Sequence, residues 1–327
     1  TQSTWGISRE LFRCESPNIL HMGFQEDILI NKISALYDQI SSLESLKPSQ
    51  EVDTLFTELV NTCMPPCHVD VTKLKGDLWE MRCKLIRMCG EAEGLLESHF
   101  SSILGEYENP IDHIAIFPYY SNYLKLSHLE YSLLNKYIAT SPKTVAFVGS
   151  GPLPFTSVVL ALKYLTTATF HNFDIDPSAN SMAIRLVSSH PDLSKRMLFH
   201  TTDIMKVTSS LRAYDVVFLA ALVGMSKEEK LQIMDHLATN MEKGTILMLR
   251  SAHAARGFLY PVIEPSDLRG FEVLSVFHPT NEVINSVIVA RKCAVSHQLH
   301  CLNRATSCAC AKTNVFNPMV EELAIED

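Results

Sequence analysis

The hydrophobic positions divide the chain into two parts with different periodicities. Up to about residue 140 they recur at spacings of three and four, the pattern of an α-helix with one buried face. The predicted helices cover 27–46, 53–62, 71 or 73 to 104, and 118 or 119 to 137. Gly90 and Gly94 weaken the third helix by about 1 kcal/mol each relative to alanine. A kink or a close approach of another segment is therefore expected there.

From residue 141 onward, short β-branched and aromatic runs alternate with helical patterns. The predicted strands are 144–148, 169–173, 197–200, 216–220, 246–249, 271–277 and 284–291. The predicted helices between the first five strands and after them are 155–165, 179–189, 227–241 and 251–260. This alternation predicts a parallel sheet with right-handed crossovers. The last two strands are separated only by a turn-rich stretch at 278–281, which predicts an antiparallel hairpin at one edge.

The arrangement divides the chain into four segments. We expect an α-helical domain over 23–140 and, over 141–293, an α/β domain with the seven-strand, Rossmann-like fold of the S-adenosylmethionine-dependent methyltransferases. Residues 1–22 have neither the apolar core of a signal peptide nor the character of a transit peptide, and are expected to be an unstructured extension. Residues 294–327 are polar and carry several cysteines, and are expected to form a flexible tail.

Composition and charge exclude several classes of function. The chain of 327 residues has a formal net charge of −8, so no general positive field favours nucleic acid. Its apolar runs are too short for a transmembrane segment, which needs about 20 apolar residues. The odd count of 9 Cys in a long chain favours reduced thiols and a cytoplasmic protein. Whether the chain forms a homo-oligomer stays open.

A glycine-rich turn follows the first predicted strand. Gly149, Ser150 and Gly151 precede a helix, and glycine lets the backbone turn tightly and lie against a ligand at the helix N-terminus. The motif is G-x-G-P-x-P instead of the dinucleotide pattern G-x-G-x-x-G. Pro152 and Pro154 also remove two N–H groups that a pyrophosphate would use. The turn therefore argues against NAD.

Further polar and small residues follow the next three strands. Asp174 and Asp176 end the second strand, where an acid commonly holds a ribose diol, and Asp176 is preferred because it lies at the tip. Asp203 follows the third strand and suits an adenine amino group, while Ala220 and Ala221 can form the floor of a cleft. Each alone is more often a loop or capping residue. Together, at successive carboxyl ends of a parallel sheet, they predict a nucleoside site.

The helical half contains two further groups of polar side chains. Glu93 and Glu97 lie four residues apart on one helical face, beside the apolar stripe. Tyr119, Tyr120 and Tyr123 lie just before the domain junction, where a pocket between helices and sheet would form. The alternative interpretations are a solvated acidic face and tyrosines that pack with their hydroxyls toward water.

Six stretches of the sequence together resemble the plant nicotianamine synthase family: GEAEGLLE, FPYYSNYLKL, VAFVGSGPLPFTSVVLA, FHNFDID, YDVVFLAALVGM and LMLRSAHAARGFLYP. The resemblance covers 26–292. It implies an enzyme that joins three S-adenosylmethionine molecules by their 3-amino-3-carboxypropyl groups, releases three methylthioadenosines and closes an azetidine ring. S-adenosylmethionine is then the substrate, and no other cofactor is implied. The product chelates metals such as iron, zinc and copper, but the reaction itself needs none.

The resemblance also implies roles for individual residues. In shorter archaeal relatives a Leu-Glu pair precedes an active-site tyrosine by 26 residues, which points here to Glu97 as the orienting base and Tyr123 as its hydroxyl partner. Glu93 is the second candidate for the base. Arg250 is expected to clamp a substrate carboxylate, with His253 as an alternative proton acceptor, and Tyr260 is expected to line the same pocket. Tyr119 and Tyr120 are also expected to line the substrate pocket.

Two other interpretations of the function stay open at this point. A small-molecule methyltransferase would use the same fold, and a non-catalytic sensor would bind S-adenosylmethionine or methylthioadenosine through the same nucleoside site. The cysteine and histidine clusters at 63–68 and 308–310 lack the paired spacing of structural zinc sites, so no metal site is predicted.

Overall fold

A computed structural model describes residues 19–294 of the chain, with four longer helices in its first half. These helices are α1 (Ile19–Ser41), α2 (Gln50–Cys63), α3 (Asp77–Leu104) and α4 (Tyr120–Leu134). Short 3₁₀ turns at Val71–Lys73 and Pro110–Ile116 connect them. The four helices predicted from the apolar periodicity are all present, but α1 begins eight residues before the predicted start at 27 and ends five residues before the predicted end at 46.

The second half forms one seven-stranded sheet with the order β3-β2-β1-β4-β5-β7-β6. Its strands are β1 (Thr144–Val148), β2 (Thr169–Asp174), β3 (Met197–Thr201), β4 (Val216–Leu219), β5 (Ile246–Ser251), β6 (Phe271–Phe277) and β7 (Ser286–Lys292). The first five strands are parallel, and β7 pairs antiparallel with both β5 and β6. The predicted Rossmann-like sheet with an antiparallel hairpin at one edge is confirmed.

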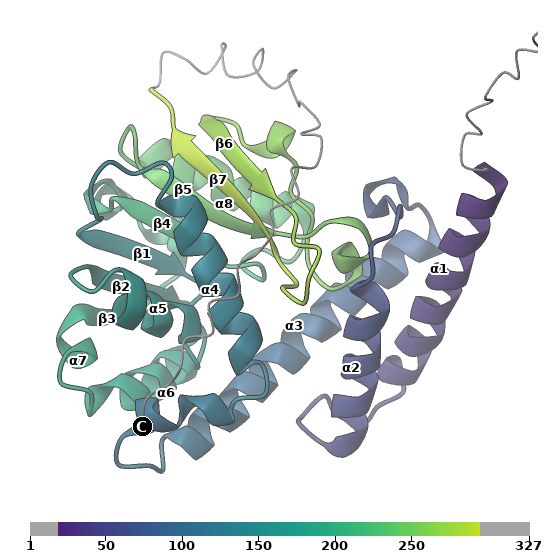
Figure 1. Ribbon diagram of the computed structural model, residues 1–327, viewed down its shortest axis with the longest axis horizontal. Coiled ribbons are helices and arrows are strands. Elements are labelled where there is room, and N and C mark those ends of the chain that lie inside the picture. The colour runs from purple at the N-terminus through teal and green to yellow at the C-terminus, as the bar shows by residue number, and fades with distance from the viewer. Residues whose placement is uncertain (1–18, 295–327) are drawn as a thin grey trace, which may run out of the picture.

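Helices cover both faces of the sheet (Figure 1). The helical segments after β1 are α5 (Phe155–Val159) with a π-helical turn (Leu160–Tyr164), α6 (Pro177–Ser188), α7 (Leu193–Arg196) and α8 (Lys227–Asn240). Shorter 3₁₀ segments lie at Ile204–Lys206, Ser209–Ala213, Ala254–Phe258 and Pro265–Asp267. In β1, Val145 and Phe147 pack with α4, α5 and α6, whereas Ala146 and Val148 pack with α8. Alternate residues of a strand thus enter two separate core layers.

The α1, α2 and α3 helices form a bundle beside the sheet, and α3 reaches from this bundle to α6 (Figure 1). The first part of α3 shares a core with α1, α2 and the 3₁₀ segment Ala254–Phe258. Leu104 at its end packs with Phe155 of α5 and Leu186 of α6. One continuous helix therefore joins the bundle to the edge of the sheet.

The two glycines in α3 do not interrupt the helix, because α3 runs without a break from residue 77 to 104. Gly90 gives the predicted close approach: a Cβ atom there would lie 3.3 Å from Leu222 and 3.2 Å from Met225. A Cβ atom on Gly94 would meet no protein atom within 4 Å. Packing explains the first glycine but not the second.

The structure differs from the predicted segments in three places. Helix α1 begins at Ile19, within the 1–22 segment expected to be unstructured, while residues 1–18 and 295–327 lie outside the described part. Helix α4 packs directly on the strands, so the boundary at 140 does not separate two cores. The 251–260 segment contains a 3₁₀ helix because its apolar residues pack against the bundle in a short, irregular turn.

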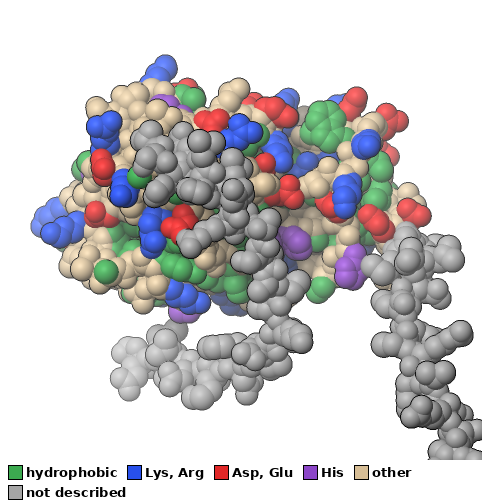
Figure 2. Space-filling view, turned by 90° about the horizontal axis from the view of Figure 1, so that it is seen from above, with side chains coloured by type: hydrophobic (Ala, Val, Ile, Leu, Met, Phe, Trp, Pro, Cys, Tyr) green, Lys and Arg blue, Asp and Glu red, His purple; other side chains and the backbone are tan. Residues whose placement is uncertain are grey.

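None of the helices in residues 19–294 is both long and apolar enough to cross a membrane. Figure 2 shows that basic and acidic side chains are interspersed on the face that it presents.

Candidate active site

A cavity of about 420 Å³ lies at the carboxyl ends of β1, β2 and β4, where the glycine-rich turn meets α3. We call it the first cavity. Gly149 and Gly151 have φ values of 80° and 65°, which only glycine adopts at little cost. A Cβ on Gly149 would lie 2.2 Å from Val223, and one on Gly151 would lie 2.7 Å from Oε2 of Glu97. The missing side chains therefore let the turn pack against the loop after β4 and let a carboxylate approach from α3.

Asp174 takes the position in the first cavity that the sequence analysis preferred for Asp176. The Asp174 carboxylate accepts hydrogen bonds from the Gly151 amide at 2.8 Å and from the Asp176 amide at 3.0 Å. Asp176 itself caps α6, accepting from the Ser178 amide at 2.8 Å, and does not line the cavity. The preference for Asp176 is thus corrected: it precedes Pro177, and Asp followed by Pro is a typical start of a helix.

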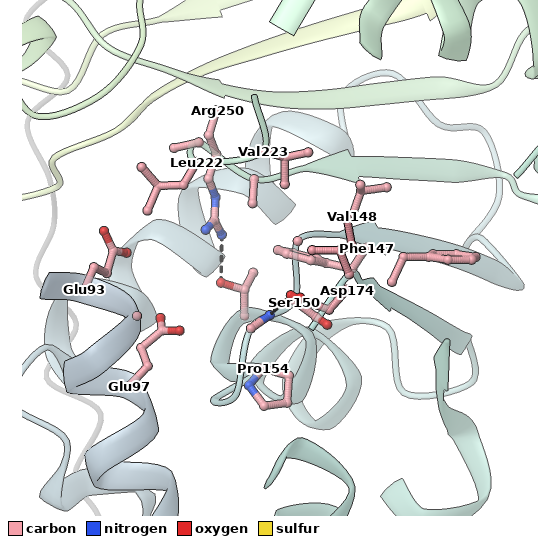
Figure 3. Close-up of a pocket in the computed structure, with 18 of the residues that line it drawn as sticks. Glu93, Glu97, Phe147, Val148, Ser150, Pro154, Asp174, Leu222, Val223 and Arg250 are labelled. Atoms are coloured by element: carbon pink, nitrogen blue, oxygen red, sulfur yellow. Dashed lines mark hydrogen bonds between the residues drawn. The ribbon is translucent and has the colours of Figure 1, made fainter. Parts of the chain in front are cut away.

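The remaining predicted nucleoside residues also line the first cavity. Asp203 lies at its rim and caps a 3₁₀ turn, while Ala220 and Ala221 lie in the loop after β4. The Ser150 hydroxyl is buried with no hydrogen-bond partner among the described residues. Figure 3 shows Ser150 and Asp174 on one side of this cavity, facing Glu93 and Glu97 on α3.

Four side chains from distant parts of the chain meet where α3 faces the sheet. The hydroxyl oxygen of Tyr123 lies 3.0 Å from Oε1 of Glu93 and 3.0 Å from Oε1 of Glu97. The hydroxyl of Tyr260 donates to Oε2 of Glu93 at 2.9 Å. A phenol has a single proton, so Tyr123 donates to one carboxylate at a time. When Tyr123 donates to Glu93, Glu97 is left without that hydrogen bond and needs a proton of its own or a cationic ligand, whereas Glu93 keeps the bond from Tyr260 in either case.

Burial changes the acidity of this group of side chains. Burial, and then the charge of Glu93, raises the pKa of Glu97 well above its ordinary value. Burial also raises the pKa of Glu93, although hydrogen bonds from Tyr260 and Tyr123 oppose the rise. Two carboxyl groups this close do not both ionise easily. A carboxylate whose pKa is raised binds a proton more readily than an ordinary one, which favours the role of a general base.

Arg250 lines the first cavity, but most of its guanidinium group is used within the protein. Its Nε and Nη2 donate to the two carboxylate oxygens of Glu130 at 2.7 and 3.0 Å, and Nη2 also donates to the Thr156 hydroxyl at 2.7 Å. Figure 3 shows its side chain across the cavity from Pro154. The expectation of a bidentate clamp for a substrate carboxylate is corrected, because Glu130 and Thr156 take Nε and Nη2, which leaves Nη1 alone to face a ligand.

A second cavity of about 410 Å³ lies between α2, α3 and α4. It shares Glu93, Tyr123, Tyr260 and Asn285 with the first cavity. Tyr119 lines only the second cavity. Within residues 19–294, no Lys or Arg lines it. The four shared residues thus form the boundary between two chambers of similar size.

Besides Asp176, two other predicted residues lie away from both cavities. The ring of Tyr120 packs on Phe155 with centroids 5.3 Å apart, where it completes a hydrophobic core. His253 stacks on His278 with centroids 4.0 Å apart. Neither side chain lines a cavity, so the structure does not bring them to the other predicted site residues.

Three residues at the site were not found from the sequence. Glu130 pairs with Arg250, and Asn285 lies at the boundary of the two cavities. Lys230 is fully buried in α8, and its ammonium donates to the carbonyls of Ala220, Ala221 and Val223 at 2.7–2.8 Å. Their sequence neighbourhoods carry no motif. Only the capping box at the start of α8 gives a signal, and it marks the helix without marking its buried lysine.

No group of three or more His, Cys, Asp or Glu in the described part of the chain is arranged to hold a metal ion.

Comparisons with known proteins agree with this arrangement. A family model described as "Nicotianamine synthase protein" matches residues 23–297. The chain is 58% identical to nicotianamine synthase of Solanum lycopersicum, covering 91% of this chain and 98% of that protein. It is 57% identical to probable nicotianamine synthase 4 of Arabidopsis thaliana, covering 93% of this chain and 98% of that one.

The fold is also that of a solved structure, MtNAS in complex with MTA and tNA. The TM-score is 0.68 at 18% sequence identity, and the match covers 83% of this chain and 98% of MtNAS. This likeness supports the fold, while the family model and the close relatives carry the assignment. On that evidence, the chain belongs to the nicotianamine synthase family.

Proposed function

We propose that the chain is a nicotianamine synthase, an aminocarboxypropyl transferase that acts on S-adenosylmethionine. It condenses three molecules of this substrate into nicotianamine and releases three methylthioadenosines. Nicotianamine then serves the chelation of iron, zinc and copper. The matches over nine-tenths of the chain to proteins of this name support the assignment.

The chemistry is a displacement at carbon. The α-amino group of one aminocarboxypropyl unit attacks the γ-carbon of the next S-adenosylmethionine, and the carbon–sulfur bond breaks. The electron pair goes to sulfur, which leaves as the neutral thioether of methylthioadenosine. Three carbon–sulfur bonds break and three carbon–nitrogen bonds form, two between units and one that closes the azetidine ring. Because the sulfonium is already a good leaving group, no metal is needed to activate it.

The residues of the first cavity would hold the nucleoside of the reacting molecule. The Gly149 to Gly151 turn would lie against it, Asp174 would bind the ribose, and Asp203 would bind the adenine, since all of these residues line this cavity. The growing chain would extend past Tyr123 into the second cavity. The position of the nucleophile selects the γ-carbon over the methyl carbon, since proximity and alignment are the main catalytic devices in such a displacement.

Glu97 would orient the attacking amino group and accept its proton, with Tyr123 as its hydroxyl partner. An α-amino group has a pKa near 8, so it is mostly protonated at pH 7 and must lose a proton before it attacks. The observation that carries this proposal is that Tyr123, at the boundary of the two cavities, contacts both Glu93 at the same boundary and Glu97 in the first cavity. A methyltransferase would need only the first cavity.

We place the reaction in the cytoplasm. Cys63, Cys67, Cys83 and Cys89 are free thiols, which suits a reducing compartment. The substrate is a small molecule, and the proposal requires neither nucleic acid nor a second protein.

One assay tests the proposed function: the protein is incubated with S-adenosylmethionine alone, and the released nucleoside is identified. We expect methylthioadenosine without an added acceptor, together with nicotianamine. Release of S-adenosylhomocysteine only when an acceptor is added would identify a methyltransferase and contradict the proposal. Tight binding without any release would identify a sensor.

A further inference from the structure

Asn285 has an unsatisfied hydrogen-bond donor at the boundary of the two cavities. Its side chain lines both cavities and is only 7% exposed. Its Nδ2 atom has no partner among the described residues. A buried donor left unpaired costs about 1–3 kcal/mol, so such a group is rarely retained without a use.

The segment between β6 and β7, which carries Asn285, is held by hydrogen bonds from two other elements. The side chain of Asn122 on α4 donates to the Glu282 carbonyl at 2.5 Å. Arg256, in the 3₁₀ segment beside the bundle, donates to the Asn281 carbonyl at 2.8 Å. Asn285 is therefore fixed at the start of β7, while the last bond of its side chain turns easily because the amide torsion is soft. The Nδ2 atom is buried in the structure, and a turn about that bond would bring the NH₂ to face a cavity.

The proposed substrate has a chemical feature that still lacks a partner. An α-amino acid carries its ammonium and its carboxylate on one carbon, so an ammonium held at Glu93 and Glu97 places a carboxylate about 3 Å from it. In the described residues no Lys or Arg lines the second cavity, and Arg250 is bonded to Glu130. The hydroxyls of Tyr123 and Tyr260 already face carboxylates. Of the four residues shared by the two cavities, Asn285 is therefore the one whose side-chain N–H donor has no partner among the described residues.

We propose that the side-chain amide of Asn285 binds the α-carboxylate of the aminocarboxypropyl unit whose amino group attacks. This assignment rests on the proposed function and adds a positioning residue to it. A neutral donor suits this place, because a second cation beside the sulfonium would repel the substrate. Asn285 would thereby fix the angle of attack and distinguish an α-amino acid from a simple amine.

The experiment compares two ligands that differ in the recognised group. Nicotianamine carries α-carboxylates, whereas methylthioadenosine is the nucleoside without any amino acid. In the Asn285→Leu variant we expect nicotianamine to bind at least about tenfold more weakly, the usual weight of a hydrogen bond to a charged group. Methylthioadenosine should bind as in the wild type by titration calorimetry. The unliganded variant should melt at the same or a higher temperature, because an unpaired donor has been removed.

Asn285→Asp provides a second variant in case leucine perturbs folding. It keeps the shape of the side chain but places a negative charge where the ligand's carboxylate should lie. We expect a larger loss of nicotianamine affinity than for leucine, again with methylthioadenosine binding retained.

Asn180→Leu is the matched control, because Asn180 is also buried, at 2% exposed, but lies on α6 away from both cavities. Its Nδ2 donates to the Thr201 hydroxyl at 2.9 Å. The variant loses that bond but also removes the unpaired Oδ1 of Asn180, so the readout is the ratio of the two ligand affinities, which should stay unchanged, in contrast to Asn285.

Two results would overturn the inference. One is wild-type nicotianamine affinity in both Asn285 variants. The other is an equal loss of both ligands together with a lower melting temperature, which would give Asn285 a structural role. Failure of the proposed function is seen separately, as absence of methylthioadenosine release by the wild-type protein from S-adenosylmethionine alone.

Discussion

The two cavities have nearly the same volume but are built in different ways. The first is formed mainly by backbone turns at the carboxyl ends of β1, β2 and β4. The second is formed by side chains of α2, α3 and α4, which are far apart in the sequence. Backbone turns fit a flat nucleoside, and such turns are positioned by the sheet itself. The helical cavity owes its shape to packing, so it can accommodate a chain that grows during the reaction.

The largest expected effect comes from Glu97, the carboxylate that lines the first cavity but not the second. Glu97→Gln keeps the size of the side chain but loses its basicity, and should slow turnover by about 10²-fold or more. The measurement is the rate of methylthioadenosine release at saturating S-adenosylmethionine. Methylthioadenosine affinity should hardly change, and nearly normal turnover would refute Glu97 as the base.

Lys230→Met should affect the first cavity selectively. The three carbonyls of the loop after β4 lose their donor, which should lower the free energy of unfolding by about 1–3 kcal/mol. Methylthioadenosine should then bind about tenfold more weakly, because this loop lines the first cavity. The control is Lys227→Met on the same helix, where the lysine is half-exposed and pairs with Asp267, and a change within about 0.5 kcal/mol is expected. Equal effects of both variants would contradict the role of Lys230.

The raised pKa of Glu97 predicts a pH dependence of stability. A carboxyl group whose folded-state pKa is raised binds more protons in the folded than in the unfolded protein, so its contribution to stability is lost as pH rises above its ordinary value near 4.5. Glu97→Gln should therefore raise the melting temperature by a few degrees at pH 7.5 and by less at pH 4.5. An equal shift at both pH values would mean that ionisation of Glu97 does not cost stability.

Gly94→Ala should have the smallest effect. It should raise the stability of the protein and weaken its binding of substrate. Alanine favours the helix by about 1 kcal/mol, and its methyl group would meet no protein atom. Because Gly94 lines the first cavity, that methyl group should weaken S-adenosylmethionine binding several-fold. Gly90→Ala is the comparison: its methyl group would press on Leu222 and Met225, so it should gain less stability. Unchanged substrate affinity in Gly94→Ala would show that the space beside this glycine is not used.

Local signals predicted the parts of the fold and site that depend on neighbouring residues. The strand pattern and the G-x-G turn identified the sheet and the first cavity, because both are set within a few residues. The choice of Asp176 over Asp174 failed because a helix-capping role competed for the outer acid, and the following Pro177 was the available signal.

Contacts across the fold could not be predicted in this way. Arg250 and Glu130 are 120 residues apart, and their pairing follows from how α4 lies on the sheet. The role of Lys230 could not be predicted either, because its partners are backbone carbonyl groups, which are present whatever the side chains are. Asn285 has no motif around it, since its importance comes from the cavities on either side.

Because α3 is one continuous helix, a movement of the bundle also moves the Glu97 carboxylate at the candidate active site. Met81 is anchored in the core with α1 and α2, and Glu97 lies about 24 Å further along the helix axis, at 1.5 Å per residue. Because Leu104 fixes the far end of the helix on α5 and α6, about 10 Å beyond Glu97, a tilt of about 6° about that end would displace the carboxylate by about 1 Å, and a misplacement of that size can cost about 10²-fold in rate. Substitutions or binding events on the outer face of the bundle can thus tune the enzyme's rate without touching its substrate.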